Sequence, residues 1–137
     1  MKVTFFYTPT KVGFQFVDIG HVLDIQDDYR IPLKSSVLKL QILKIDQSRI
    51  SFLPEGVFGG MNKLEELMIA GGNLNRLTKK TFNGLNKLKK LSLNHNNLTK
   101  LDRDLFKFQQ NLEYLDISHN NFHKLEPYFF KVLLDFF

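Results

Sequence analysis

Three histidines are the residues in this sequence best suited to chemistry. His95 and His119 are 24 residues apart, and His123 follows shortly after. Imidazole binds transition metals and changes its charge between about pH 5 and 8. However, the chain has no cysteine, and no carboxylate completes a ligand set beside these histidines. The sequence therefore predicts no metal site and no cofactor.

Other residue patterns typical of enzymes are missing. Without cysteine there is no thiol nucleophile. The glycine pairs Gly59-Gly60 and Gly71-Gly72 lack the lysine and the helix start that a phosphate-binding loop requires. No pattern brings a serine, a histidine and an acidic residue to one pocket. The sequence predicts that the protein is not an enzyme.

The strongest pattern is a repeat with a period of 24 residues. Four blocks begin at Leu40, Leu64, Leu88 and Leu112, and six positions in each block are apolar without exception. The nineteenth position is always phenylalanine: Phe58, Phe82, Phe106 and Phe130. A chain that is 43% hydrophobic does not produce this by chance. A fixed period of this length indicates a stack of similar small units.

Each block reads as a short strand followed by a turn. The fourth and sixth positions are apolar, which is the alternation of a strand with one buried face. The ninth position holds turn residues: Ser48, Gly72, Asn96 and Asn120. Stacked blocks would form a parallel sheet with the return segments on its other side. Each phenylalanine would lie in the core and bury about 150–250 Å².

The pattern LxxLxLxxNxLxxLxxxxFxxLxx over residues 40–133 resembles the leucine-rich repeat. Its period and phenylalanine column resemble the extracellular type found in Toll-like receptor ectodomains and Slit. The resemblance implies an α/β solenoid, a right-handed superhelix with a parallel sheet on the concave face and irregular, 3-10 or loop returns on the convex face. It also implies a hydrogen-bonded ladder of ninth-position asparagines, which Asn96 and Asn120 retain and Gly72 interrupts.

Gln109 interrupts an apolar column that the other blocks fill with Met61, Leu85 and Leu133. We expect the neighbouring Phe108 to move in and cover this gap.

The repeat divides the chain into segments of one domain. Residues 1–11 read as a degenerate signal or an N-terminal extension, and residues 12–39 as an N-terminal cap. The repeats occupy residues 40–63, 64–87, 88–111 and 112–137, the last without a cap. An uncapped apolar end favours self-association, and it also fits a fragment of a longer array without independent function. No apolar stretch is long enough to span a membrane.

The sequence gives conflicting signs about location. The absence of cysteine fits the cytoplasm. Asn97-Leu98-Thr99 is an acceptor motif for N-glycosylation, which requires the secretory route. The family resemblance favours an extracellular or secreted protein, with the cytoplasm as the alternative.

The strand residues that point away from the core are the candidates for partner contact. On the concave face these are Ile42, Lys44, Glu66, Met68, Lys90, Ser92, Asn94, His95, Tyr114, Asp116 and His119. Tyr114 and Met68 are the best anchors, because aromatic and methionine side chains are enriched at interfaces. Glu66 with Lys90, and Glu65 with Lys89, are expected to pair across strands. By resemblance, the partner is a protein ligand in a receptor-like, adhesion or innate-immune role.

Basic residues suggest a second kind of partner. The net charge is +5, and Arg76, Lys100 and Lys124 share the thirteenth position, which predicts a basic stripe beside the sheet. Such a stripe could bind an acidic glycan or an anionic membrane surface. Nucleic acid is not expected, because no aromatic residues interleave with the basic ones on an exposed face.

Overall fold

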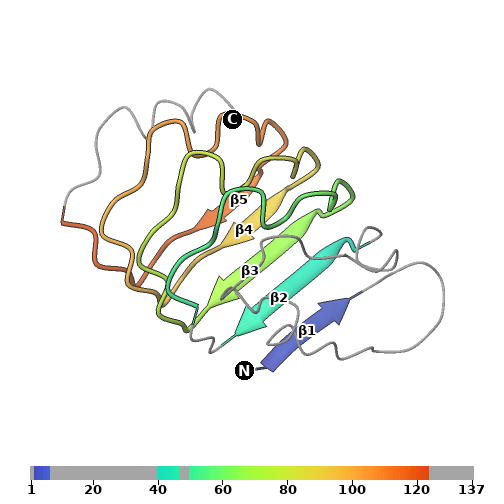
Figure 1. Cartoon of the computed structure of the whole chain (residues 1–137). Helices are drawn as coiled ribbons and strands as arrows, with labels where there is room; N and C mark the ends of the chain where they lie inside the picture. The colour runs from blue at the N-terminus through green and yellow to red at the C-terminus, as the bar shows by residue number, and fades with distance from the viewer. Residues whose placement is uncertain (1, 7–39, 47–49, 124–137) are drawn as a thin grey trace.

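The computed structural model describes residues 2–6, 40–46 and 50–123, and its strands form one five-stranded sheet (Figure 1). The strands follow chain order: β1 (Lys2–Phe6), β2 (Ile42–Asp46), β3 (Glu66–Ala70), β4 (Lys90–Ser92) and β5 (Tyr114–Asp116). The expectations for residues 12–39, Ser48, Lys124, Phe130, Leu133 and the C-terminal end lie outside the described residues.

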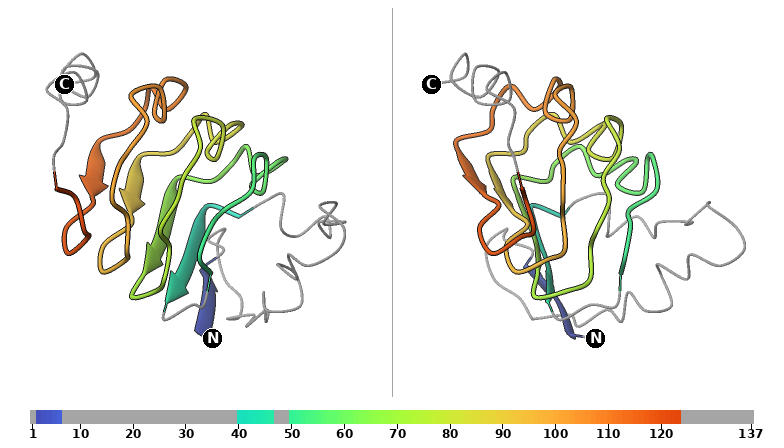
Figure 2. Two further views of the ribbon diagram at one scale, coloured as in Figure 1. Left: turned by 60° about the vertical axis from the view of Figure 1, so that its left-hand side comes forward. Right: turned by 90° about the vertical axis from the view of Figure 1, so that its left-hand side faces the viewer.

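Strands β2 to β5 are parallel, as the repeat predicts. Leu43 lies opposite Leu67, Leu67 opposite Leu91, and Leu91 opposite Leu115, so each strand is in register with the next at a shift of one repeat. The strands line one side of the molecule and the return segments line the other (Figure 2). The stacked α/β solenoid is therefore confirmed.

Strand β1 is an element that the repeat does not predict. It pairs antiparallel with β2, with Lys2 opposite Asp46 and Phe6 opposite Ile42. An unpaired strand edge offers a row of free N–H and C=O groups to other chains. Residues 2–6 cover this edge at the first repeat. The pairing could not be predicted, because residues 1–11 do not follow the repeat pattern.

The predicted column of phenylalanines forms the centre of the core. Phe58, Phe82 and Phe106 are each no more than 1% exposed. The rings of Phe58 and Phe82 stack with centroids 6.2 Å apart, and those of Phe82 and Phe106 with centroids 6.0 Å apart. Each ring packs between the strands and the return segments, so the column fills the space between the two sides of the stack.

The described return segments are made of turns rather than helices. The carbonyl oxygen of each core phenylalanine accepts a hydrogen bond from the backbone N–H three residues later. These donors are Met61, Leu85 and Gln109, at 3.1, 3.2 and 3.0 Å. The same turn therefore follows each of these phenylalanines and holds its ring in the equivalent position of the core in every repeat, which we also call a coil of the solenoid.

The asparagine ladder is present where the sequence retains it. The Asn96 side chain is 4% exposed. Its Oδ1 accepts from the Leu74 N–H at 3.1 Å, and its Nδ2 donates to the Ile69 carbonyl at 2.7 Å. Asn120 repeats both contacts one coil later, with the Leu98 N–H and the Leu93 carbonyl. Gly72 contributes only its backbone N–H, which donates to the His95 carbonyl at 3.1 Å.

The expectation that Phe108 covers the gap at Gln109 is wrong. Gln109 is itself 1% exposed, whereas Phe108 is 52% exposed. The turn places Gln109 in the inward position that Met61 and Leu85 occupy, so Phe108 points away from the core. The Gln109 amide is satisfied there because its Nε2 donates to the Phe82 carbonyl at 2.8 Å. The polar side chain thus bridges two coils.

Candidate functional site

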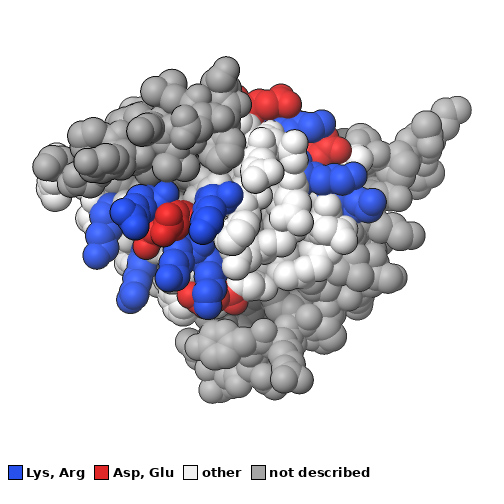
Figure 3. Space-filling model, turned by 90° about the horizontal axis from the view of Figure 1, so that it is seen from above, with Lys and Arg blue, Asp and Glu red and all other residues white. Residues whose placement is uncertain are grey.

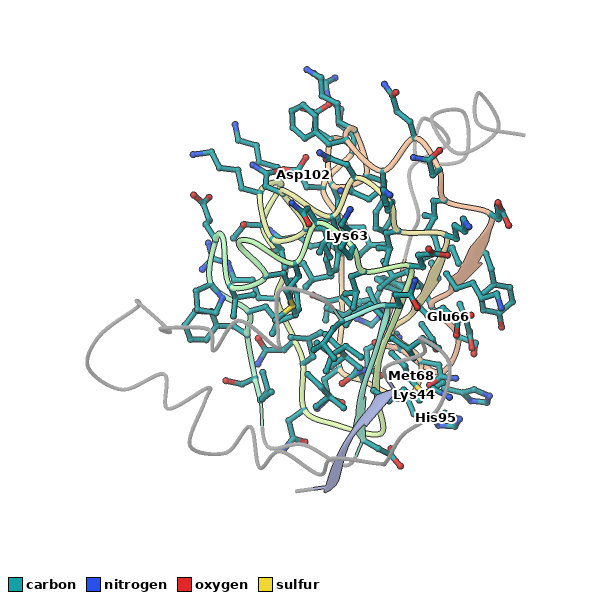
Figure 4. All side chains as sticks on the ribbon, turned by 90° about the vertical axis from the view of Figure 1, so that its right-hand side faces the viewer. Lys44, Lys63, Glu66, Met68, His95 and Asp102 are labelled. Atoms are coloured by element: carbon teal, nitrogen blue, oxygen red, sulfur yellow. The ribbon has the colours of Figure 1, made fainter. Side chains whose placement is uncertain are left out.

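The face of the sheet that points away from the phenylalanine column, predicted to be the concave face, carries the outward side chains of β2 to β5. Lys44, Glu66, Met68 and His95 lie along this strand side, whereas Lys63 and Asp102 belong to the return segments above it (Figure 4). The periodic register brings the side chains of equivalent positions side by side on neighbouring strands. Backbone pairing between the strands therefore fixes where these side chains start relative to one another.

The two predicted cross-strand ion pairs are present. Lys90 Nζ lies 2.8 Å from Glu66 Oε1, and Lys89 Nζ lies 2.9 Å from Glu65 Oε2. The hydrogen bond from Lys89 lowers the pKa of Glu65, and the reciprocal contact raises the pKa of Lys89. These pairs join β3 to β4 and favour their register.

Asp116 is tied into the sheet itself. One of its oxygens accepts from both Ser118 N–H at 3.0 Å and Ser118 Oγ at 2.7 Å, and the other accepts from Asn94 Nδ2 at 2.8 Å. The bonds from Ser118, together with that from Asn94, lower the pKa of Asp116. Asp116 and Asn94 therefore hold the end of β5 in place, and neither is a clean probe of partner binding.

The centre of the concave face carries short side chains beside Met68. Ala70 and Ser92 are only 9% and 7% exposed, and Met68 is half-buried. Ser92 offers little surface to a partner, because its short side chain lies between the longer Met68 and Asp116 in register. Its Oγ has no hydrogen-bond partner among the described residues.

Tyr114 lies on the same face of the sheet, and 53% of its surface is exposed. It starts β5 and lies opposite Lys90. On the other flank, Ile42 and Lys44 of β2 are half-buried, with Lys44 opposite Met68. The arrangement presents one large aromatic side chain at the edge of a flat, partly apolar area.

The two predicted histidines meet at the rim where the strands end. The rings of His95 and His119 stack with centroids 4.1 Å apart and planes inclined by 6°. Both residues have a φ of 52°, and Gly71 occupies the equivalent position with a φ of 61°. Parallel rings direct their nitrogen lone pairs into separate planes, so the pair as it stands does not converge on one metal ion. The described residues contain no cluster of three or more metal-ligating side chains.

Two members of the predicted basic stripe, Arg76 and Lys100, are exposed. Neither forms an ion pair with another described residue, whereas Lys80 pairs with Glu55 at 3.3 Å. Seen from above, Lys and Arg side chains lie in two areas, a larger one on the left of the view and a smaller one at the upper right, each with acidic side chains among them (Figure 3). The exposed aromatic ring of Phe108, with Lys107 Nζ 5.9 Å from its centroid, was not predicted. The sequence did contain a signal for this exposure: Phe108 comes one residue before Gln109, whose repeat position points into the core.

Within the part of the chain that the structure describes, no helix has the length and apolar character needed to cross a membrane.

Comparisons with known proteins agree on the family. The family model of the leucine rich repeat matches residues 39–98 and 86–133, which is more than half of the 137 residues. The crystal structure of the leucine-rich repeat domain of APL1B is similar, with a TM-score of 0.53 and 30% sequence identity. That match covers 58% of this chain and 24% of that chain. No curated protein matches the sequence. The repeats, the sheet that they build and these matches together show that the chain belongs to the leucine-rich repeat family.

Proposed function

We propose that the protein is a binding module that presents the concave face of its sheet to another protein. The observation that carries this is the exposed Tyr114 on the same face of the sheet as the half-buried Met68. Aromatic residues and methionine are enriched at protein interfaces, and a few such anchors carry most of the binding energy. Leucine-rich repeat domains commonly mediate protein binding, and the family is an interaction scaffold rather than a catalytic one.

The rigidity of the sheet supports this role. Tyr114 and Met68 lie on strands that are held by backbone pairing to the neighbouring strand. The backbone at these residues therefore loses little conformational freedom when a partner binds. We further propose an extracellular recognition or adhesion role, on the strength of the family resemblance.

Alanine at Tyr114 or Met68 is expected to weaken binding of the protein partner at least about tenfold, which corresponds to about 1.4 kcal/mol. The partner would first be isolated with the full chain, and titration calorimetry would then give the Kd of each variant. Phe108→Ala is the matched control, because Phe108 is as exposed as Tyr114 but lies on a return segment. Loss of binding in the control alone would overturn the concave-face proposal.

A second candidate function is binding of an anionic glycan or membrane surface. It is favoured by Arg76 and Lys100, which are exposed at equivalent positions of adjacent coils and form no ion pair with other described residues. Exposed charges like these attract polyanions, and salt screens the attraction beyond about 10 Å at 0.1 M.

This candidate predicts that the full chain is retained on heparin at low salt and released as salt rises. The double variant Arg76→Ala/Lys100→Ala should elute at distinctly lower salt. Lys89→Ala/Lys90→Ala removes the same charge from residues that are already paired with Glu65 and Glu66, and it should shift elution less. If both double variants lower the elution salt equally, binding depends on net charge alone, and the basic stripe has no specific role.

A further inference from the structure

The tenth position of the repeat is an exposed asparagine in three successive coils: Asn73, Asn97 and Asn121. Only Asn97 is followed at the second position by a hydroxyl residue, Thr99. The equivalent residues in the other two coils are Asn75 and His123. The repeat therefore offers one complete N-glycosylation motif and two incomplete ones on the same kind of turn.

The backbone at Asn97 leaves its side chain available. The Asn97 N–H donates to the Leu74 carbonyl at 2.8 Å, and the Asn121 N–H donates to the Leu98 carbonyl at the same distance. The Asn97 side-chain amide forms no hydrogen bond with the other described residues, and Thr99 is exposed. The preceding Asn96 is the opposite case, since it is buried and its amide holds the ladder. A large group on Asn97 would project into solvent without displacing the core or the ladder.

We propose that Asn97 carries an N-linked glycan. Its Nδ2 forms a bond to the anomeric carbon of an oligosaccharide donated by a lipid diphosphate, the diphosphate leaves, and the amide gives up one proton. The Thr99 hydroxyl completes the motif that the transferring enzyme reads.

The position of this glycan also restricts how a partner can approach, a consequence that rests on the proposed concave-face function. Asn97 lies just beyond the ends of the strands, on the rim that carries His95 and His119. Tyr114 lies at the start of β5, so it belongs to the opposite rim. Asn97 follows the last residue of β4, whereas Tyr114 is the first residue of β5, so the two residues lie at opposite ends of their strands. The glycan therefore leaves the rim at Tyr114 open and crowds the rim at the histidines.

The test is translation of the full chain in the presence of endoplasmic-reticulum microsomes, read as a gel shift that endoglycosidase removes. One shift is expected for the natural sequence and for Thr99→Ser, and none for Asn97→Gln or Thr99→Ala. His123→Thr completes the motif at Asn121 on an equivalent turn, so this variant should show a second shift.

Absence of the shift in the natural chain overturns the proposal, and so does a shift that persists in Asn97→Gln. A shift in His123→Thr alone would show that the chain reaches the enzyme while Asn97 is not used, which also overturns it. None of these outcomes depends on Tyr114, so failure here is distinguishable from failure of the concave-face proposal.

Discussion

Replacing Phe82 with alanine is expected to lower the free energy of unfolding by about 3–5 kcal/mol. Phe82 is 0% exposed, and it stacks against Phe58 on one side and Phe106 on the other. Both neighbouring rings are held by their own turns, so the cavity left by the missing ring cannot easily collapse. Urea denaturation of the full chain, followed by circular dichroism, measures the loss.

Phe108→Ala is the control for this prediction. It removes the same ring from a residue that is 52% exposed, and its effect should stay within about 0.5 kcal/mol. Phe82→Leu should fall between the two, because leucine refills part of the cavity. Similar stabilities for Phe82→Ala and Phe108→Ala would show that the column of rings is not the centre of the core.

Asn96→Ala is expected to be the second most damaging change, with a loss of about 2–4 kcal/mol. It leaves the Leu74 N–H and the Ile69 carbonyl without their partner, and a buried polar group in that state costs about 1–3 kcal/mol. The Leu93 carbonyl is spared, because it also accepts from Asn120. Denaturation gives the total loss, and hydrogen exchange at the Leu74 amide reports the broken bond directly.

Asn97→Ala is the matched control, one residue away and exposed. It should change stability by no more than about 0.5 kcal/mol. If Asn96→Ala leaves both the stability and the Leu74 exchange rate unchanged, the ladder makes no contribution to the fold.

The sequence could predict most of the sheet because one register governs it. Leu43, Leu67 and Leu91 occupy the same place in successive repeats, and the period alone sets them opposite one another. The ion pair of Glu66 with Lys90 follows from the same register. Strand β1 could not be predicted in this way, since residues 2–6 lie outside the repeat and their pairing with β2 is a long-range contact.

The candidate site was less predictable, because the exposure of a short outward side chain depends on the length of the side chains on the neighbouring strands. Ser92 faces outward as expected, yet it is only 7% exposed between its register partners Met68 and Asp116. Gln109 shows the same limit inside the core. Its polarity suggested a gap, but the Phe82 carbonyl of the previous coil offers the hydrogen bond that makes burial acceptable. Neither the burial of Ser92 nor that of Gln109 can be predicted without knowing the contacts with the adjacent repeat.

The most direct test of the concave-face proposal is site-specific photo-crosslinking. A photo-reactive phenylalanine analogue would replace Tyr114 in one variant and Phe108 in another. The two positions are 53% and 52% exposed, and they lie on β5 and on a return segment. Irradiation in the cells that make the protein should give a discrete adduct with a protein partner from position 114 and none from position 108. An adduct from position 108 alone, or none from position 114, would contradict the assignment of the concave face as the binding surface.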